Sequence, residues 1–340
     1  SYLWYVSPLA AVGAIKESFE VVRKFMSFGQ QIDIGAFEPN AATGIACYKL
    51  HNWMSMLEDP ADFGYIQTLN EFTMPELGRD LDRIKQDFVI PDLDNPLSFE
   101  NLRNVIVPVS EIMDADKQEF LLEKAKGGVN LVLIGLMPKY DADMNPCQIL
   151  ANAIHCKTQM HGKIGNVATN NDQFPSYVFG SITCTEKKSK KLATYAGKAV
   201  GVKVNRFKGT VVLLSFDCSS QGNYAKINFL KNTLADLGLT FRISTSHPNV
   251  RAFVHKGEKS GMFYLLNSSP SQPFRRAKAA GTKVVVQIDL KALGYRGSKV
   301  NMVDVFTDEE ILTTTDELRE GLYFALGNLD SRAYHFTVKS

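Results

Sequence analysis

The stretch RNVIVPVSEIMDADKQEFLLEKAKGGVNLVLIGLMPK, residues 103–139, decides the fold of this chain. Two short apolar runs, Val105–Val109 and Asn130–Ile134, stand on either side of a helical segment from about Asp114 to Lys126. Strands that are buried on both faces of a sheet read as continuous apolar runs, and Gly127–Gly128 supplies a stop for the helix. The stretch therefore predicts a strand–helix–strand unit, and a right-handed crossover makes its two strands parallel.

Composition is that of an ordinary globular protein. Of the 340 residues, 45% are hydrophobic and 22% are charged, and the length leaves room for two or three domains. The formal net charge of +2 offers no strong field for a polyanion, so nucleic acid is not a predicted partner. No apolar run approaches the ~20 residues that span a bilayer, so no membrane association is predicted.

The cysteines bear on compartment and on metal binding. There are five, scattered along the chain: Cys47, Cys147, Cys156, Cys184 and Cys218. Their odd number and the lack of CxxC spacing are typical of free thiols in a reducing compartment. We therefore expect a cytoplasmic protein without disulfides. Because the histidines do not cluster around these cysteines, the sequence predicts neither a metal site nor a cofactor.

Residues 1–30 form the first predicted segment. Apolar side chains recur there at spacings of three and four, which predicts an amphipathic helix over residues 8–26. The apolar stripe of that helix consists of Leu9, Val12, Ile15, Phe19, Val22 and Phe25. Nothing earlier in the sequence covers this stripe, so we expect a connector helix that packs on a larger body.

Residues 31–246 form the predicted α/β domain. Its expected elements before the central unit are a strand over 31–37 ended by Glu38-Pro39-Asn40, a helix over 43–57, a helix over 73–85 and a short strand over 88–90. The helix over 73–85 is expected to begin at a capping box, Thr73-Met74-Pro75-Glu76. Together with the central unit, these elements predict a sheet of about four parallel strands with helices on its faces.

A β excursion is predicted inside this domain, at about 162–217, because the helical period disappears there. Its expected strands are 176–183, 199–205 and 210–216, and a helix from Asn223 to Gly238 then returns to the first sheet. From residue 247 to 340 the chain reads as all β. Seven short, evenly spaced strands predict a small antiparallel sandwich or open barrel, over 251–255, 262–267, 283–289, 300–306, 310–313, 321–326 and 333–338.

The first sheet resembles that of flavodoxin-like folds, and of class I glutamine amidotransferase domains in particular. Such a domain carries a cysteine nucleophile on a tight elbow after a central strand. Here the expected elbow, residues 135–138, reads GLMP and holds neither cysteine nor serine. Cys147, ten residues on, reads as a buried structural thiol. The sequence therefore predicts the fold without the amidotransferase chemistry.

The succession of motifs carries a wider resemblance. IDIGAFEP is followed by NVIVPVSEIMDADKQEFLLEKAKGGVNLVLIG, AGKAVGVKVNRFKGTVVLLSFD and LADLGL, and then by MFYLLNSS and VNMVDVFTDEEIL. This order resembles the region downstream of the catalytic barrel in β-galactosidases of glycoside hydrolase family 42 and in related prokaryotic family 35 enzymes. In those proteins a (β/α)8 barrel comes first, an amidotransferase-like domain follows, and a small β domain closes the chain.

The resemblance implies a non-catalytic role for this chain. The two catalytic glutamates of the family lie in the barrel, which needs about 250 residues, and no glutamate here can be matched to either. We therefore predict no catalytic residue. The implied partners are the barrel of the same protein, further copies of the chain in a homo-oligomer, and a β-linked sugar. Loops beyond strand ends suggest one wall of the substrate cleft, with Glu38, Asn40 and Tyr140 as the candidate residues.

Two other functions stay open. A self-standing carbohydrate-binding or interaction protein would need an exposed aromatic platform. The aromatic candidates of the β domain are Phe263, Tyr264, Tyr295, Tyr323, Phe324, Tyr334 and Phe336. An active amidotransferase-like hydrolase is the third possibility, and the missing nucleophile at the elbow disfavours it.

Overall fold

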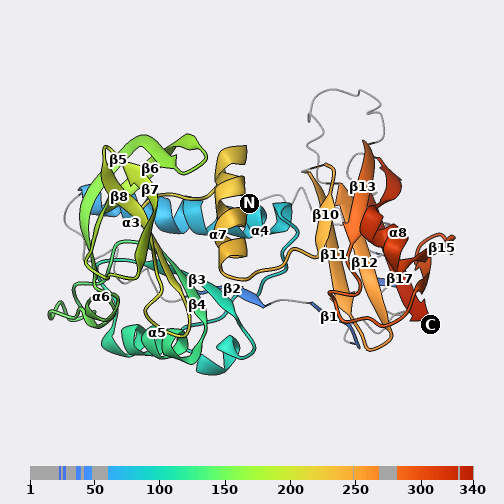
Figure 1. Cartoon of the computed structure of the whole chain (residues 1–340), viewed down its shortest axis with the longest axis horizontal. Helices are drawn as coiled ribbons and strands as arrows, with labels where there is room; N and C mark the ends of the chain where they lie inside the picture. The colour runs from blue at the N-terminus through green and yellow to red at the C-terminus, as the bar shows by residue number, and fades with distance from the viewer. Residues whose placement is uncertain are drawn as a thin grey trace, which may run out of the picture. The chain divides into compact units, whose positions relative to one another are not determined.

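The computed structural model describes residues 23, 26–27, 36–39, 42–47, 60–247, 249–267, 282–327 and 330–339. The chain divides into two compact units, each with its own sheets (Figure 1). The α/β unit consists of Ala41–Phe241, and the β unit consists of Arg242–Ser340 with Ser1–Asn40. In the described part of the chain, no helix is both long and apolar enough to cross a membrane.

One mixed sheet organises the α/β unit, with the strand order β2-β3-β4-β9-β8-β7-β5-β6. Its first four strands run parallel: β2 (Thr43–Ile45), β3 (Asn104–Val109), β4 (Asn130–Gly135) and β9 (Val211–Leu214). Helix α5 (Ala115–Gly127) connects β3 to β4, and Gly128 ends it in the left-handed region at φ 113°. The predicted strand–helix–strand unit is thus confirmed. The sheet has four parallel strands, as expected, but β2 and β9 are not the strands that were predicted to flank the central pair.

The antiparallel strands continue the same sheet. They are β5 (Cys156–Thr169), β6 (Gln173–Cys184), β7 (Ser189–Tyr195) and β8 (Lys198–Val204). Beyond β9 the chain turns to pair with β6, since Phe179 N donates to the Ser215 carbonyl at 2.9 Å and Asp217 N donates to the Tyr177 carbonyl at 2.8 Å. Strands β5–β8 and the end of β9 therefore form a closed ring. The predicted strand over 210–216 is the fourth parallel strand, so assigning it to an excursion was wrong.

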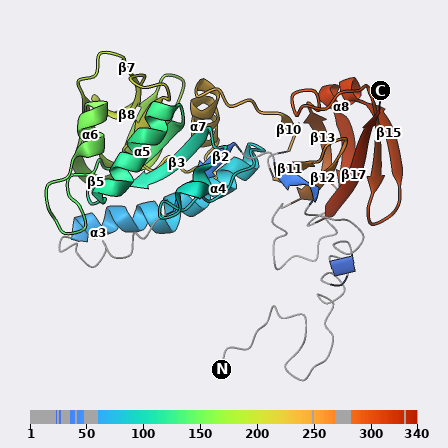
Figure 2. The same cartoon turned by 90° about the horizontal axis from the view of Figure 1, so that it is seen from below.

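Helices cover both faces of the parallel strands, as Figure 2 shows. Alternate side chains decide which face each helix covers. Val105 and Val107 of β3 pack with Leu121 of α5 and with Leu150 of α6 (Ile149–Ile154). Ile106 points to the opposite face, in the cluster that contains residues of α3 (Pro60–Gln67), α4 (Met74–Arg83) and α7 (Tyr224–Asp236). A π-helix, Thr68–Thr73, joins α3 to α4, and a short 3-10 helix, Pro96–Phe99, precedes β3.

Two predictions before the central unit need correction. Residues 43–45 form β2 rather than the start of a helix, because their backbone pairs with β3, while residues 48–59 lie outside the described part. The second correction concerns Thr73, which does not cap a helix. The helical path continues through it from Pro60, and its hydroxyl donates to Asp217 instead. The predicted short strand is a single parallel bridge from Val89 to Gly44 at the edge of β2.

The predicted connector helix and first strand fall largely on residues outside the described part. Arg23, Met26 and Ser27 are helical, as expected. Phe37 is not in a strand, whereas Glu38–Pro39 form the two-residue strand β1.

The β unit has two antiparallel sheets. The larger has the order β1-β11-β12-β17-β14-β15 and the smaller the order β10-β13-β16. Their remaining bounds are β10 (Ile243–Thr245), β11 (Val250–Lys256), β12 (Ser260–Asn267), β13 (Thr282–Ile288), β14 (Lys299–Asp304), β15 (Glu310–Thr314), β16 (Leu322–Leu326) and β17 (Ser331–Lys339). A capping box at Thr314 and Glu317 begins helix α8 (Thr315–Glu320), which follows β15. All seven predicted strands are confirmed.

Both sheets of the β unit contribute to one core. Val254 and Phe263 from the larger sheet belong to the same buried cluster as Val284, Val286 and Phe324 from the smaller one. Strand β10 was not predicted. It pairs with β13, so residues 242–246 lie with the β unit and not with the α/β domain to which the predicted boundary at 246 assigned them.

Candidate functional site

Tyr140 lies beyond the carboxyl end of β4, at the edge where open parallel sheets bind their ligands. It forms a parallel bridge with Ile112, which follows β3, and it is 37% exposed. Backbone amides of Lys139 and Tyr140 donate to the Glu111 carbonyl at 2.7 and 2.9 Å, and the Lys139 ammonium pairs with the Glu111 carboxylate. The loops after β3 and β4 are therefore tied together, with Tyr140 at the surface.

The other two cleft-wall candidates do not join this edge in the described structure. Glu38 lies in β1, opposite Lys256 of β11, and so belongs to the β unit. Glu38 therefore does not follow a parallel strand, although the sequence predicted that it would. Asn40 lies outside the described residues.

The elbow position after β4 holds no nucleophile. Gly135 makes the turn at φ 128°, and a Cβ atom there would stand 2.0 Å from the Val109 carbonyl oxygen, so only glycine fits. The next two side chains, Leu136 and Met137, are buried in the two cores. The structure thus shows the tight turn that the fold requires and an apolar filling where an amidotransferase would present its cysteine.

Two other thiols near this edge are structural. Cys147 is buried and its sulfur accepts a hydrogen bond from Gln118 Nε2 at 3.3 Å. Cys218 follows β9 and is fully buried; burial, assisted by the neighbouring Asp217 carboxylate, raises the pKa of its thiol well above the ordinary range. A thiol that stays protonated is a poor nucleophile.

A buried polar network occupies the carboxyl end of β9, centred on Asp217. Its Oδ1 accepts hydrogen bonds from Thr73 Oγ1 at 3.0 Å, Ser219 N at 3.0 Å and Ser219 Oγ at 2.6 Å. Its Oδ2 accepts from Gln221 Nε2 at 3.1 Å and lies 3.8 Å from the ammonium of Lys226, which is itself buried. Because the carboxylate is fully engaged, it fastens the helix at Thr73 to the loop after β9.

Asp80 forms a second, adjoining network. It accepts from Ser220 N at 2.7 Å, from Ser220 Oγ at 2.5 Å and from Arg83 at 2.7 Å. Burial raises the pKa of Asp80, and the hydrogen bonds from Ser220 and Arg83 offset part of that rise. Burial also acts to raise the pKa of Glu76, but hydrogen bonds from Arg83 and Arg79 outweigh it, so the net pKa is lowered.

These two networks were not predicted from the sequence. The available signal was SFDCSS, residues 215–220, in which an acid and small polar residues follow a buried strand directly. The serine hydroxyls donate to carboxylates that already hold other donors, so the arrangement suits fastening better than general acid–base work. In the described part of the chain, no group of three or more His, Cys, Asp or Glu side chains is placed to hold a metal ion.

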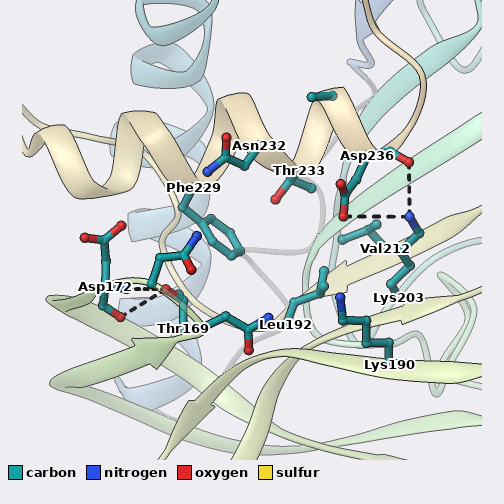
Figure 3. Close-up of a pocket in the computed structure, with 13 residues that line it drawn as sticks. Thr169, Asp172, Lys190, Leu192, Lys203, Val212, Phe229, Asn232, Thr233 and Asp236 are labelled. Atoms are coloured by element: carbon teal, nitrogen blue, oxygen red, sulfur yellow. Dashed lines mark hydrogen bonds and ion pairs between the residues drawn. The ribbon is translucent and has the colours of Figure 1, made fainter.

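A pocket of about 370 Å³ lies between helix α7 and the antiparallel strands (Figure 3). The turn 169–172, strands β7 to β9 and one side of α7 line it, with Phe229 among the lining residues. Lys203 Nζ donates to the Asp236 carbonyl at 3.1 Å and lies 3.9 Å from its carboxylate. Lys190, Asp172 and Asn232 add further polar groups. The pocket thus contains amide groups, negatively charged carboxylates and positively charged ammonium groups around one aromatic ring. Such a lining can hydrogen-bond to the hydroxyl groups of a neutral, polyhydroxylated ligand.

Among the described residues of the β unit, the aromatic side chains do not form the platform that carbohydrate binding would require. Of the seven candidate rings, only Tyr323 is largely exposed, at 81%. Tyr264 is half-buried and packs edge-on against His255, with ring centroids 5.1 Å apart. The other five belong to the buried core: Phe263, Tyr295, Phe324, Tyr334 and Phe336.

Comparisons with known proteins agree with this architecture. A family model described as GLMA-like, second domain, matches residues 65–196. An exo-β-D-glucosaminidase from Pyrococcus horikoshii is 22% identical over 306 residues, which is 85% of this chain and 37% of that protein. This chain therefore spans well under half the length of that relative.

Solved structures of glycoside hydrolases share the fold over nearly the whole chain. A catalytic mutant of a family 42 β-galactosidase from G. stearothermophilus has a TM-score of 0.71 at 13% identity, over 98% of this chain and 46% of that one. The β-galactosidase from Bacillus circulans sp. alkalophilus gives 0.70 at 11% identity, over 97% and 46%. An α-L-fucosidase from Paenibacillus thiaminolyticus gives 0.59 at 11% identity, over 89% and 49%.

These matches show the fold of the chain. They do not identify a sugar substrate, because the enzymes named act on different glycosides. They bear out the resemblance that the order of motifs indicated. This chain is therefore similar to a GLMA-like second domain over residues 65–196, and it shares its fold with part of family 42 β-galactosidases.

Proposed function

We propose that this chain serves as the non-catalytic part of a β-galactosidase-like glycoside hydrolase of the cytoplasm. The observation that carries the proposal is the likeness in fold over 98% of this chain but only 46% of a family 42 β-galactosidase. Glycoside hydrolysis needs two opposed carboxyl groups about 5–10 Å apart. Three buried carboxylates of the described α/β unit are Glu76, Asp80 and Asp217. They are engaged with serine, threonine, arginine and lysine side chains. In this proposal a (β/α)8 barrel of the same protein supplies the chemistry.

An activity comparison tests this division of labour. The chain and the full-length product of its gene would each be assayed on aryl β-galactosides and aryl β-glucosaminides, because relatives of both kinds match. We expect turnover only from the full-length protein. Turnover by the chain alone that disappears when one of its own carboxylates is changed to the amide would overturn the proposal.

The proposal includes a wall of the substrate cleft at Tyr140 and contacts between copies of the chain. Tyr140 supports it through its position at the carboxyl edge and its partial exposure. In the full-length enzyme, Tyr140→Ala should raise KM for a β-linked substrate and leave kcat nearly unchanged. Tyr224→Ala is the matched control, because Tyr224 is 63% exposed on α7 of the same unit. An unchanged KM for Tyr140→Ala would remove Tyr140 from the cleft.

The pocket beside α7 favours carbohydrate binding as a second candidate function. Its Asn232 is exposed and faces a cavity that also contains Lys190 and Phe229. Titration of galactose and glucosamine into the chain, followed by NMR, should shift resonances of the pocket in the wild type and not in Asn232→Ala. Shifts spread over the whole surface, or equal in the variant, would exclude a sugar site there.

A further inference from the structure

Cys156 and Cys184 face each other across two neighbouring strands. Cys156 begins β5 and Cys184 ends β6, and the two are direct partners in the antiparallel register. Their sulfur atoms lie 2.8 Å apart. Cys147 and Cys218 are buried elsewhere in the fold, and Cys47 is exposed. The register therefore selects one pair out of five thiols.

The backbone around the pair has the geometry that a disulfide needs. Thr185 N donates to the His155 carbonyl at 3.0 Å, so the pair one step further along the ladder, Cys156 with Cys184, is of the non-hydrogen-bonded kind. In such pairs the Cα atoms approach to about 4.5 Å. Disulfides form over Cα separations of about 4.4–6.8 Å, so the strands need not move apart or together for the bond to form.

Polar contacts beside the pair hold the two strand ends in place. Arg206 donates to the Glu186 carboxylate at 2.6 Å and lies 3.3 Å from His155 Nδ1. His155 precedes Cys156 directly, and Glu186 lies two residues after Cys184. This cluster joins the flanks of both cysteines and keeps their side chains opposed.

Access to the two thiols is unequal. Cys156 is fully buried, whereas Cys184 is partly exposed and lines a pocket of about 520 Å³. Lys191 and Lys198 line the same pocket. Their ammonium groups attract an anionic reagent into this pocket, beside the Cys184 sulfur. A reagent can therefore reach Cys184 first, with Cys156 positioned behind it.

We propose that Cys156 and Cys184 form a reversible disulfide by exchange with a small anionic disulfide of the glutathione class. The Cys184 thiolate attacks one sulfur of glutathione disulfide, which forms a mixed disulfide and releases one glutathione thiolate. The Cys156 sulfur then attacks the Cys184 sulfur, which breaks the mixed disulfide, and the Cys156 proton passes to the second departing glutathione. The two cysteines lose two electrons and glutathione disulfide gains them. The bond fastens the start of β5 to the end of β6.

Peptide mapping of the native full chain tests the proposal. The protein would be equilibrated in buffers of rising glutathione disulfide to glutathione ratio, alkylated, and digested without reduction. We expect one cross-linked species, which joins the peptides containing Cys156 and Cys184, while Cys147 and Cys218 stay alkylatable after unfolding. Reduction should reverse the cross-link. The oxidised protein should also unfold several degrees higher than the reduced one, because the bond closes a loop of the chain.

Two variants make the result decisive. Cys184→Ser should abolish both the cross-link and the oxidation-dependent rise in Tm. Cys47→Ser is the matched control: it removes the exposed thiol, and both effects should persist. A stable mixed disulfide at Cys184 without the cross-link, or two unmodified thiols at every ratio, would overturn the proposal.

Discussion

Thr73 Oγ1 donates a hydrogen bond of 3.0 Å to Oδ1 of Asp217, a residue 144 positions further along the chain. The donor lies where the π-helix meets α4, and the acceptor follows β9. Thr73 is fully buried and Asp217 nearly so. One helical face is therefore tied to the carboxyl edge of the sheet through a charge that lies away from solvent.

Asp217→Asn tests how much this tie contributes. The substitution removes the charge opposite Lys226. It also places an amide donor against either Gln221 or the two donors Thr73 and Ser219, which need an acceptor. We expect the free energy of unfolding to fall by about 2–4 kcal/mol. Urea denaturation followed by circular dichroism measures the change.

Asp236→Asn is the control for that experiment. Its side chain is 59% exposed and lies 3.9 Å from Lys203. A surface pair of this kind contributes about 0–1 kcal/mol. If the two variants lose equal stability, the buried network is not what holds the helix.

Gly135→Ala addresses the turn after β4. A methyl group there would meet the Val109 carbonyl at 2.0 Å, and the residue sits at φ 128°. We expect a loss of several kcal/mol, of the order of 4 or more, or failure to fold.

Gly127→Ala is its matched partner, since Gly127 ends α5 with open space where the methyl would lie. Helix propensity predicts a gain of about 0.5–1 kcal/mol there. Thermal scans of both variants decide the point, and a tolerated Gly135→Ala would show that the close approach to Val109 is relieved at little cost.

Acid should weaken the α/β unit through Glu76. The pKa of Glu76 in the folded chain lies below the ordinary value of 4.5. The ionised carboxylate therefore contributes its full stabilisation above pH 4.5, and this stabilisation is lost as the pH falls through the lowered pKa. Asp80 works in the opposite sense, because its raised pKa means that ionisation costs stability as the pH rises. Arg83 binds both carboxylates.

Arg83→Met should lower the free energy of unfolding by about 1–3 kcal/mol near neutral pH. It should also reduce the acid limb, which is the loss of stability at low pH that Glu76 produces. Arg79→Met should change the limb less, since Arg79 is 65% exposed and binds only Glu76. Urea midpoints measured between pH 3 and 7 give both quantities. An acid limb that is unchanged in Arg83→Met would contradict this assignment.

Removal of residues 1–28 tests the connector helix. The buried clusters described for the α/β unit draw on residues 45 to 241. The deletion should therefore leave a cooperative thermal transition in place. Burial of the six side chains of the apolar stripe would contribute on the order of 10 kcal/mol, because each buried side chain contributes about 1.5–3 kcal/mol.

If that stripe packs on a barrel or on another copy of the chain, its removal should improve solubility and weaken self-association, as light scattering would show. Loss of the cooperative transition would instead assign the stripe to the core of the α/β unit.

Local patterns in the sequence determined the parts of the fold that depend on neighbouring residues. The apolar runs 105–109 and 130–134, with the glycine stop between them, were enough for the parallel pair and its helix. Even spacing and turn residues were enough for the seven strands of the β unit. The same local evidence misread residues 43–45 as helix and Thr73 as a cap, because Thr73 has its partner 144 residues away.

Only the tertiary structure decided which distant residues meet. Pairing between β6 and the end of β9 closes the antiparallel strands into a ring, and no local pattern carries that information. The register between β5 and β6 sets Cys156 opposite Cys184, where scattered spacing had suggested five independent thiols. Pairing with β11 places Glu38 in the β unit, since the position of a two-residue strand depends on the partner that satisfies its backbone hydrogen bonds.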